Sequence, residues 1–199
     1  WCDNYTVYKN MHAEYFVIPE RGCHLIPDDV SWDVGVLITG DGLGVPCHTS
    51  AKIAADWVET VAVFGLGPVG LGNVLYQSHA GRRVIGIDRS LPRLEIAKRL
   101  GAAEIIVAED NVDVPALIKE LTKGHGSDVA IEAAGAPATV RLCFASVRKG
   151  GMVVFNGEQS ALSLSPIDDF IRRDITAVGS WFYHFSEYPK MLKLARDGL

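Results

Sequence analysis

The chain has 199 residues, of which 48% are hydrophobic and 22% charged, and its formal net charge at pH 7 is −5. This composition is typical of a globular domain with a buried core, and the acidic balance argues against a nucleic-acid surface, which needs clustered basic residues. No apolar run is long enough to predict a membrane span.

The cysteines and the chain ends suggest the setting of the protein. Four cysteines, at positions 2, 23, 47 and 143, are widely spaced and form no Cys-x-x-Cys pair. This scatter favours a reduced, cytoplasmic setting over a disulfide framework. The chain begins at Trp1 without a signal-peptide pattern and ends at Leu199 directly after a predicted helix, so we expect it to be cut from a longer protein.

The first part of the chain predicts one strand and two helices. Residues 13–18 (Ala-Glu-Tyr-Phe-Val-Ile) are typical of a strand, which Pro19 would close. A helix is expected to begin at Asp28 or Asp29, whose side chains suit an N-cap, and the glycine-rich residues 40–44 should interrupt it. A further helix is predicted from about Pro46 to Ala55.

From residue 60 onward, predicted strands and helices alternate. The strands are expected at residues 60–64, 83–87, 104–107, 128–132, 151–155 and 175–180. The helices are expected at residues 68–80, 91–100, 113–123, 137–147, near 166–171 and 187–197. Because the strands are continuous apolar runs, helices should cover both faces of the sheet, which predicts an α/β fold with a doubly wound, parallel, six-stranded sheet.

A glycine motif follows the first of these strands. Val61-Ala62-Val63-Phe64 leads into Gly65, Gly67 and Gly70 with Gly-x-Gly-x-x-Gly spacing, and a helix follows. Gly65 permits the tight turn, Gly67 lets a pyrophosphate approach the backbone, and Gly70 lets the helix pack closely on the sheet. The motif therefore predicts a dinucleotide-binding loop, which Leu66, Pro68 and Val69 complete.

An acidic residue stands where a dinucleotide site needs one. The second strand ends in Asp88, eighteen residues after Gly70, and its carboxylate is placed to accept hydrogen bonds from the adenosine ribose hydroxyls. A 2′-phosphate at that position would be repelled, so we expect NAD to be preferred over NADP. Arg89 and Arg93 could pair with such a phosphate or cover the adenine edge, and solvated helix residues are the simpler alternative for both.

Several segments together resemble one family. They are His12-Ala13-Glu14-Tyr15, Ile26-Pro27-Asp28, Gly40-Asp41 ahead of Cys47-His48, Val63 to Gly70, Lys98 to Ala102, and Asp128 to Gly135. In this order they resemble the zinc-containing medium-chain alcohol and polyol dehydrogenases, most of all the sorbitol and threonine dehydrogenase branches. That family joins a GroES-like catalytic domain to a Rossmann domain.

The resemblance implies a catalytic zinc that polarises the alcohol oxygen while hydride passes to NAD. The family's third zinc ligand, a Cys, Asp or Glu, matches Asp41, which we expect to be both catalytic and metal-binding. The other zinc ligands would lie upstream of residue 1, so the chain alone should not oxidise alcohols. An Asp beside glycines is also a common turn former, which is the structural alternative for Asp41.

The resemblance also places residues along the cofactor crevice and divides the chain. Ala133 and Ala134 should line the nicotinamide-ribose side, and Asn156 could bond the ribose or the carboxamide. His48 should have a structural role, with a ring nitrogen bonded to backbone. Residues 1–36 would be a remnant of the catalytic domain, 37–183 the Rossmann domain, and 184–199 the start of a segment that returns to the catalytic domain.

The partners expected are a small alcohol or polyol and a second copy of the chain. In the family the sixth strand pairs with its counterpart across a twofold axis, which would cover this edge in a homodimer or a homotetramer. No nucleic acid and no membrane are expected. Two alternatives stay open: a zinc-independent quinone or enone reductase of the same superfamily, for which Asp41 is unnecessary, and a non-catalytic nucleotide-binding fragment.

Overall fold

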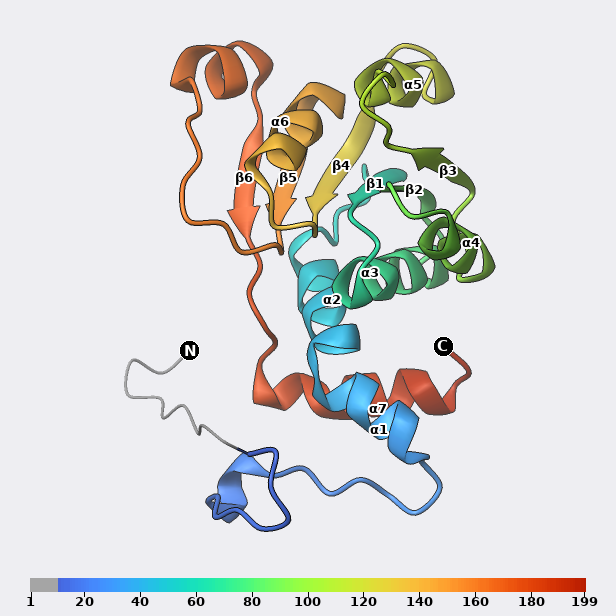
Figure 1. The fold of residues 1–199 in the computed structure, drawn as a ribbon, viewed down its shortest axis with the longest axis vertical. Helices are drawn as coiled ribbons and strands as arrows, with labels where there is room; N and C mark the ends of the chain where they lie inside the picture. The colour runs from blue at the N-terminus through green and yellow to red at the C-terminus, as the bar shows by residue number, and fades with distance from the viewer. Residues whose placement is uncertain (1–10) are drawn as a thin grey trace.

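The computed structural model describes residues 11–199 and contains one parallel sheet (Figure 1). Its strands lie in the order β3-β2-β1-β4-β5-β6. They are β1 (Thr60–Phe64), β2 (Arg83–Asp88), β3 (Glu104–Val107), β4 (Ser127–Glu132), β5 (Val147–Phe155) and β6 (Thr176–Gly179). The strand order reverses between β1 and β4, so the predicted doubly wound fold is confirmed, and ligands of such sheets bind at this switch point.

Helices cover both faces of the sheet, as the continuous apolar strands predict. They are α3 (Pro68–His79), α4 (Leu91–Arg99), α5 (Val114–Leu121) and α6 (Pro137–Ser146). On one face Phe64 packs with Ile118 of α5 and Phe144 of α6, all buried. On the other face Val63 packs with residues of α3 and α4, among them Leu94. Alternate residues of β1 therefore enter two separate cores.

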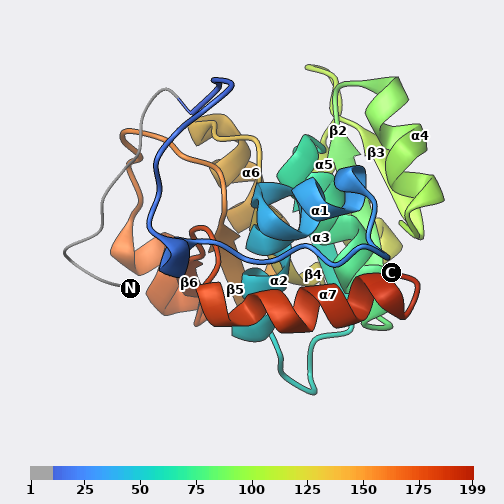
Figure 2. The same cartoon turned by 90° about the horizontal axis from the view of Figure 1, so that it is seen from below.

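A third group of helices lies beyond the carboxyl ends of the strands (Figures 1 and 2). They are α1 (Trp32–Thr39), α2 (Asp41–Lys52) and α7 (Tyr188–Arg196). Ile38, Cys47, Tyr76 and Met191 are buried in the core that they share with α3. Short helical turns complete the described elements: η1 (Glu20–Gly22), η2 (Pro166–Phe170), η3 (Ile171–Arg173) and η4 (Phe185–Glu187). None of the helices in residues 11–199 is long and apolar enough to cross a membrane.

The predicted strand at residues 13–18 is wrong. The segment has no strand structure, and its side chains are largely exposed, with Tyr15 at 91% and Val17 at 92%. A strand needs hydrogen bonds to a neighbouring strand, and the described sheet offers this segment none. The β-branched and aromatic residues therefore suit a strand, but no strand lies beside them among residues 11–199.

The predicted helix starts near residues 28 and 46 also need correction. Ser31, and neither Asp28 nor Asp29, is the N-cap of α1, because its Oγ accepts a hydrogen bond from the Val34 amide at 3.3 Å. Helix α2 begins at Asp41 and runs through Pro46, which was predicted to begin the helix. A proline inside a helix lacks the amide that would reach back four residues, and its ring crowds the carbonyl at that position, so it is accepted only where tertiary contacts hold the helix.

Most other elements match their predicted bounds within one or two residues, and β5 is the largest exception. It begins at Val147, which pairs with Ser127 before the register between β4 and β5 shifts. The predicted start at residue 151 corresponds to the part of β5 beyond this irregularity. The predicted division at residues 36 and 183 stays a prediction, and residues 1–10, with Trp1 and Cys2, lie outside the described residues.

A buried carboxylate braces the loop that follows β4. Glu132 is fully buried, and its Oε1 accepts hydrogen bonds from the amides of Ala134 and Gly135 at 3.0 and 2.9 Å, with the Ala136 amide at 3.5 Å. Its Oε2 has no hydrogen-bond partner among the described residues, and a Cβ on Gly157 would come within 2.4 Å of it. Burial raises the pKa of Glu132, and the backbone amides only partly oppose this rise.

Replacing Glu132 should therefore change how stability depends on pH. A carboxyl whose folded-state pKa is raised stabilises the fold fully below the ordinary glutamate pKa, and this contribution is lost as pH rises through the raised value. Glutamine keeps the accepting oxygen and cannot ionise. We expect the free energy of unfolding of Glu132→Gln, relative to the unsubstituted chain, to increase as pH rises from about 4 to 8.

Urea unfolding at several pH values measures this difference, and Glu132→Ala serves as the comparison. Alanine leaves the loop amides without their acceptor, so relative to Glu132→Gln it should cost about 2 kcal/mol across the whole pH range. Parallel stability curves for Glu132→Gln and the unsubstituted chain would contradict the assignment of a raised pKa to this carboxyl.

Candidate functional site

The glycine turn between β1 and α3 has the shape of a dinucleotide cradle. Gly65 has φ of +88°, and a Cβ there would lie 2.7 Å from the Ala134 amide nitrogen. A Cβ on Gly70 would lie 1.8 Å from the Gly65 carbonyl oxygen, so α3 can start this close to the strand only with glycine. A Cβ on Gly67 would meet no atom within 4 Å. Packing therefore requires the first and third glycines, whereas the second faces open space.

The open space lies at the N-terminus of α3. Gly67 is the N-cap, no side chain caps the helix, and Pro68 occupies its first position. The first amides of a helix lack intrahelical acceptors and carry the positive end of the helix dipole. A phosphate in this position would meet backbone amides, and Gly67 leaves room for it. Gly65, Gly67, Pro68, Val69 and Gly70 thus share one turn whose open amides have the geometry that suits an anion.

Asp88 holds this turn together from the neighbouring strand. Its Oδ2 accepts a hydrogen bond from the Leu66 amide at 2.6 Å, and its Oδ1 accepts one from the Ser90 amide at 2.8 Å. The Arg93 guanidinium lies 3.9 Å from Oδ2. Each carboxylate oxygen can accept more than one hydrogen bond, so the acceptors remain available to a ribose hydroxyl.

A cavity of about 900 Å³ opens in front of Asp88. It lies at the carboxyl ends of β1, β2 and β3 and is closed by the start of α6. Five predicted cofactor residues line it: Gly65, Asp88, Arg89, Arg93 and Ala134. Most of the remaining lining is apolar, which suits the flat face of an adenine ring. Arg89 pairs with Asp110 at 3.3 Å on the exposed rim.

The other predicted cofactor residues do not line this cavity. Leu66 is fully buried and offers only its amide to Asp88. Ala133 packs against the glycine turn, where its Cβ lies 3.7 Å from the position of a Cβ on Gly70. Its amide donates a hydrogen bond to the Phe64 carbonyl at 2.8 Å. The cofactor contacts predicted for these residues stay predictions.

Asn156 belongs to a buried polar network at the end of β5. Its Nδ2 donates to Thr49 Oγ1 at 3.0 Å and to the Ser180 carbonyl at 2.9 Å, and its Oδ1 accepts from Asn73 Nδ2 at 3.0 Å. Thr49 Oγ1 in turn donates to Ser180 Oγ at 2.9 Å. Both ends of the Asn156 amide are thus engaged within the protein, which favours a positioning role over the predicted contact with ribose or carboxamide.

Asp41 lies exposed at the first turn of α2. Tyr183 lies nearby: burial raises the pKa of Tyr183, and the negative charge of Asp41 raises it further. The Tyr183 hydroxyl donates to the Thr39 carbonyl at 2.7 Å. Residues 11–199 contain no group of three or more His, Cys, Asp or Glu side chains that could hold a metal. A protein zinc site needs three such ligands, so the described residues do not form one by themselves.

His48, also on α2, contacts the side chain of a residue far away in the sequence. Its Nδ1 lies 3.0 Å from Oε2 of Glu187, the last residue of η4. The pair ties α2 to the turn that precedes α7. This contact is consistent with the structural role that the sequence suggested, and the predicted backbone bond stays a prediction.

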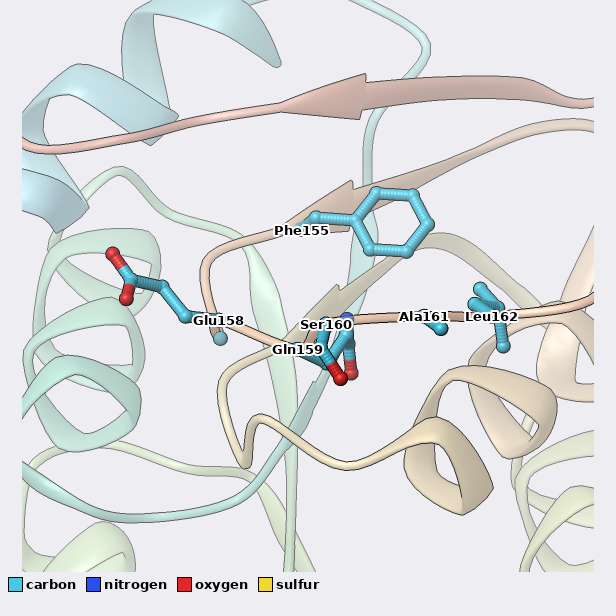
Figure 3. Close-up of a pocket in the computed structure, with 7 residues that line it drawn as sticks. Phe155, Glu158, Gln159, Ser160, Ala161 and Leu162 are labelled. Carbon is cyan, nitrogen blue, oxygen red and sulfur yellow. The ribbon is translucent and has the colours of Figure 1, made fainter.

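Two features of this end of the sheet were missed. The first is Glu132, which shapes the loop that carries Ala133 and Ala134. The sequence could have indicated it, because an acid at the end of a buried apolar strand needs hydrogen-bond partners. The second is a hollow of about 790 Å³ lined by Phe155 and residues 157–162 (Figure 3). The Glu158 carboxylate points away from the Phe155 ring in this view. The hollow adjoins the loop after β4, because the Glu158 carbonyl would contact a Cβ on Gly135 at 3.1 Å.

Comparison with known sequences gives one consistent answer. The family described as zinc-binding dehydrogenase matches residues 68–197. The chain is 32% identical over 197 residues to the probable D-xylulose reductase A of Neosartorya fischeri, which covers 96% of this chain and 54% of that protein. It is 32% identical over 188 residues to the sorbitol dehydrogenase of Bacillus subtilis, covering 94% and 52%. The chain therefore spans about half the length of these curated relatives.

Solved structures agree with the sequences. The 2R,3R-butanediol dehydrogenase of Bacillus subtilis superposes with a TM-score of 0.77 at 28% identity, covering 87% of this chain and 49% of that one. The alcohol dehydrogenase TADH of Thermus sp. ATN1 gives a TM-score of 0.78 at 28% identity, covering 86% and 49%. With its glycine turn, its acidic strand end and its sheet order, the chain belongs to the zinc-binding dehydrogenase family.

Proposed function

We propose that the protein is an oxidoreductase that transfers hydride between the CH–OH group of an alcohol or polyol and NAD. The observation that carries this proposal is the cradle at the switch point of the sheet, where the uncapped N-terminus of α3 follows Gly65, and Gly65 and Asp88 both line the same cavity. The named relatives, a xylulose reductase and a sorbitol dehydrogenase, support polyols as the substrate class.

The described residues fit a bound dinucleotide. The amides at the start of α3 would hold the pyrophosphate, and the Asp88 carboxylate would accept the adenosine ribose hydroxyls. Arg89 and Arg93 would flank the adenine at the cavity rim, and Ala133 and Ala134 would allow the cofactor to approach closely. NAD supplies the hydride acceptor when it is bound, and the chain's residues bind and orient it.

For zinc, we propose that Asp41 supplies one ligand and that the others come from outside the described residues. A carboxylate is an acceptable zinc ligand, and its exposure at the start of α2 leaves it accessible. Nothing in residues 11–199 completes the site. The proposal therefore takes the remaining ligands from outside residues 11–199.

The thiols support our proposal of a reducing, cytoplasmic setting. Cys23, Cys47 and Cys143 are free, and the two buried ones have pKa values raised by burial. A buried thiol with a raised pKa is unreactive, because the thiolate is the nucleophile.

The cradle predicts that Gly67→Ala will weaken NAD binding without weakening the fold. A Cβ there meets no protein atom within 4 Å but enters the space assigned to the pyrophosphate. We expect the Kd for NAD to rise about tenfold, which is ~1.4 kcal/mol. Gly179→Ala is the control, since that Cβ also meets no atom within 4 Å and lies on β6, away from the cradle.

Calorimetric titration with NAD and with NADP measures both affinity and preference. Asp88 should make NAD the tighter ligand of the unsubstituted chain. If Gly67→Ala and Gly179→Ala bind NAD with equal affinity at matched thermal stability, the pyrophosphate does not bind at this turn. Tighter binding of NADP than of NAD would contradict the role given to Asp88.

The zinc proposal predicts that Asp41→Ala lowers both the zinc content and the alcohol-dependent reduction of NAD in the full-length gene product. A zinc site with three protein ligands loses much of its affinity for zinc when one ligand is removed. We therefore expect activity to fall at least about a hundredfold. Asp33→Ala, on the exposed first turn of α1, is the control. Unchanged zinc content and turnover in Asp41→Ala would favour the zinc-independent reductase alternative.

We further propose that two copies associate through β6. This strand is at one edge of the sheet, and the exposed side chains of Ile171 and Trp181 flank it. An edge strand has unpaired backbone groups that a twofold-related copy can satisfy. Sedimentation equilibrium should give a dimer or a multiple of it, and a monomer at micromolar concentration would contradict the proposal.

A further inference from the structure

A second cavity lies at the opposite end of the sheet from the cradle. Its volume is about 800 Å³, and it is lined by residues from the end of α5, the loop before β4, the end of α6, the start of β5 and η3. In Figure 1 the arrows of β4, β5 and β6 point toward the level of α2 and α3, so these segments lie at the tails of the arrows. The dinucleotide cradle does not use this end.

The lining of this basic pocket is rich in cations. Lys119, Arg148, Lys149 and Arg173 line it together with His125. None of the eight described residues that line it carries a carboxylate. The chain as a whole has a net charge of −5, so this concentration of positive charge is local and runs against the overall balance.

Two of these cations are held in place. The Arg148 guanidinium donates to Asp128 Oδ1 at 2.5 Å and lies 5.0 Å from the centre of the Trp57 ring. Arg173 donates to the backbone carbonyls of Phe144 and Val147. Carbonyl oxygens orient a guanidinium without neutralising it, so the Arg173 charge remains available.

The two lysines of the pocket have no ionic or hydrogen-bonding partner among the described residues. Neither Lys119 Nζ nor Lys149 Nζ has a hydrogen bond or ion pair with a residue in the described part of the chain. Lys149 lies on the irregular start of β5, where three more residues than on β4 separate the paired positions Ser127–Val147 and Val129–Met152. Because of this bulge, the consecutive residues Arg148 and Lys149 both line the pocket. Bulges often redirect a side chain toward a functional site.

We propose that the basic pocket binds a phosphate group, either as the free ion or on a small phosphorylated molecule. Arg148 is paired with the Asp128 carboxylate, so it adds oriented donors but little net charge. The Arg173 guanidinium and the two ammonium groups match a group with at least two negative charges and several acceptor oxygens better than a single carboxylate. The volume is in the range of small-molecule pockets. One pocket of five basic residues is too local for a nucleic-acid stripe. The inference does not depend on the proposed dehydrogenase activity.

Calorimetric titration of the chain with tripolyphosphate tests this inference, with and without saturating NAD. Lys119→Gln/Lys149→Gln removes the two uncommitted charges from exposed positions, so the fold should be retained. The matched control is Lys98→Gln/Arg99→Gln, which makes the same change of charge on the exposed last turn of α4. We expect the pocket variant to bind tripolyphosphate about tenfold more weakly and the control to change less than about twofold.

Three outcomes would overturn the inference. They are absence of binding, equal weakening in the two double variants, and binding that disappears when NAD is present, which would locate the anion at the N-terminus of α3. If tripolyphosphate binds as expected, orthophosphate and glycerol phosphate separate the two sources. Similar affinities assign the pocket to the free ion, and tighter binding of glycerol phosphate assigns it to a phosphorylated small molecule.

Discussion

The close contact between α2 and α3 sets the geometry on which the candidate site depends. A Cβ on Gly72 would lie 1.8 Å from the Gly42 carbonyl oxygen and 2.8 Å from Pro46 Cγ, so the two helices meet through backbone. Pro46 has no amide to donate to the Gly42 carbonyl, which leaves that oxygen for the approaching helix. Helix α3 starts at the dinucleotide turn and α2 starts at Asp41. Their contact therefore fixes where the candidate metal ligand lies relative to the cradle.

The polar network of Thr49, Asn73, Asn156 and Ser180 reinforces this arrangement. It links α2 and α3 to the carboxyl ends of β5 and β6, so it joins the two halves of the doubly wound sheet. A buried polar side chain that loses its partner costs about 1–3 kcal/mol, which is more than an average hydrogen bond contributes. Such a network disfavours sliding of the helices, and it explains why Asn156 is turned into the protein although it lies at a ligand-binding edge.

The sequence predicted what depends on neighbouring residues and failed where distant contacts decide. The strands from β1 to β4 and the roles of Gly65 and Gly70 follow from apolar runs and local spacing. The segment at residues 13–18 has strand-forming side chains but no strand beside it among the described residues, and Pro46 lies inside α2, where it packs close to Gly72 of α3. Likewise, the acid at position 132 is visible in the sequence, but its three amide donors become apparent only when the loop after β4 has folded back.

The polarity of the backbone explains why charged side chains are held differently at the two ends of the sheet. Helices begin at the carboxyl end, where free amides hold acids: the Leu66 amide binds Asp88, and the Ala134 and Gly135 amides bind Glu132 just before α6. Helix α6 ends at the other edge, where the Phe144 carbonyl holds Arg173. The amides belong to the loops that lead into α3 and α6, and the Phe144 carbonyl belongs to the last turn of α6. In both places neutral backbone groups orient a charged side chain without supplying an opposite charge. Backbone polarity therefore accounts for the uncapped amides at the start of α3, to which we assign a phosphate, and for an Arg173 guanidinium held by carbonyl groups at the other end.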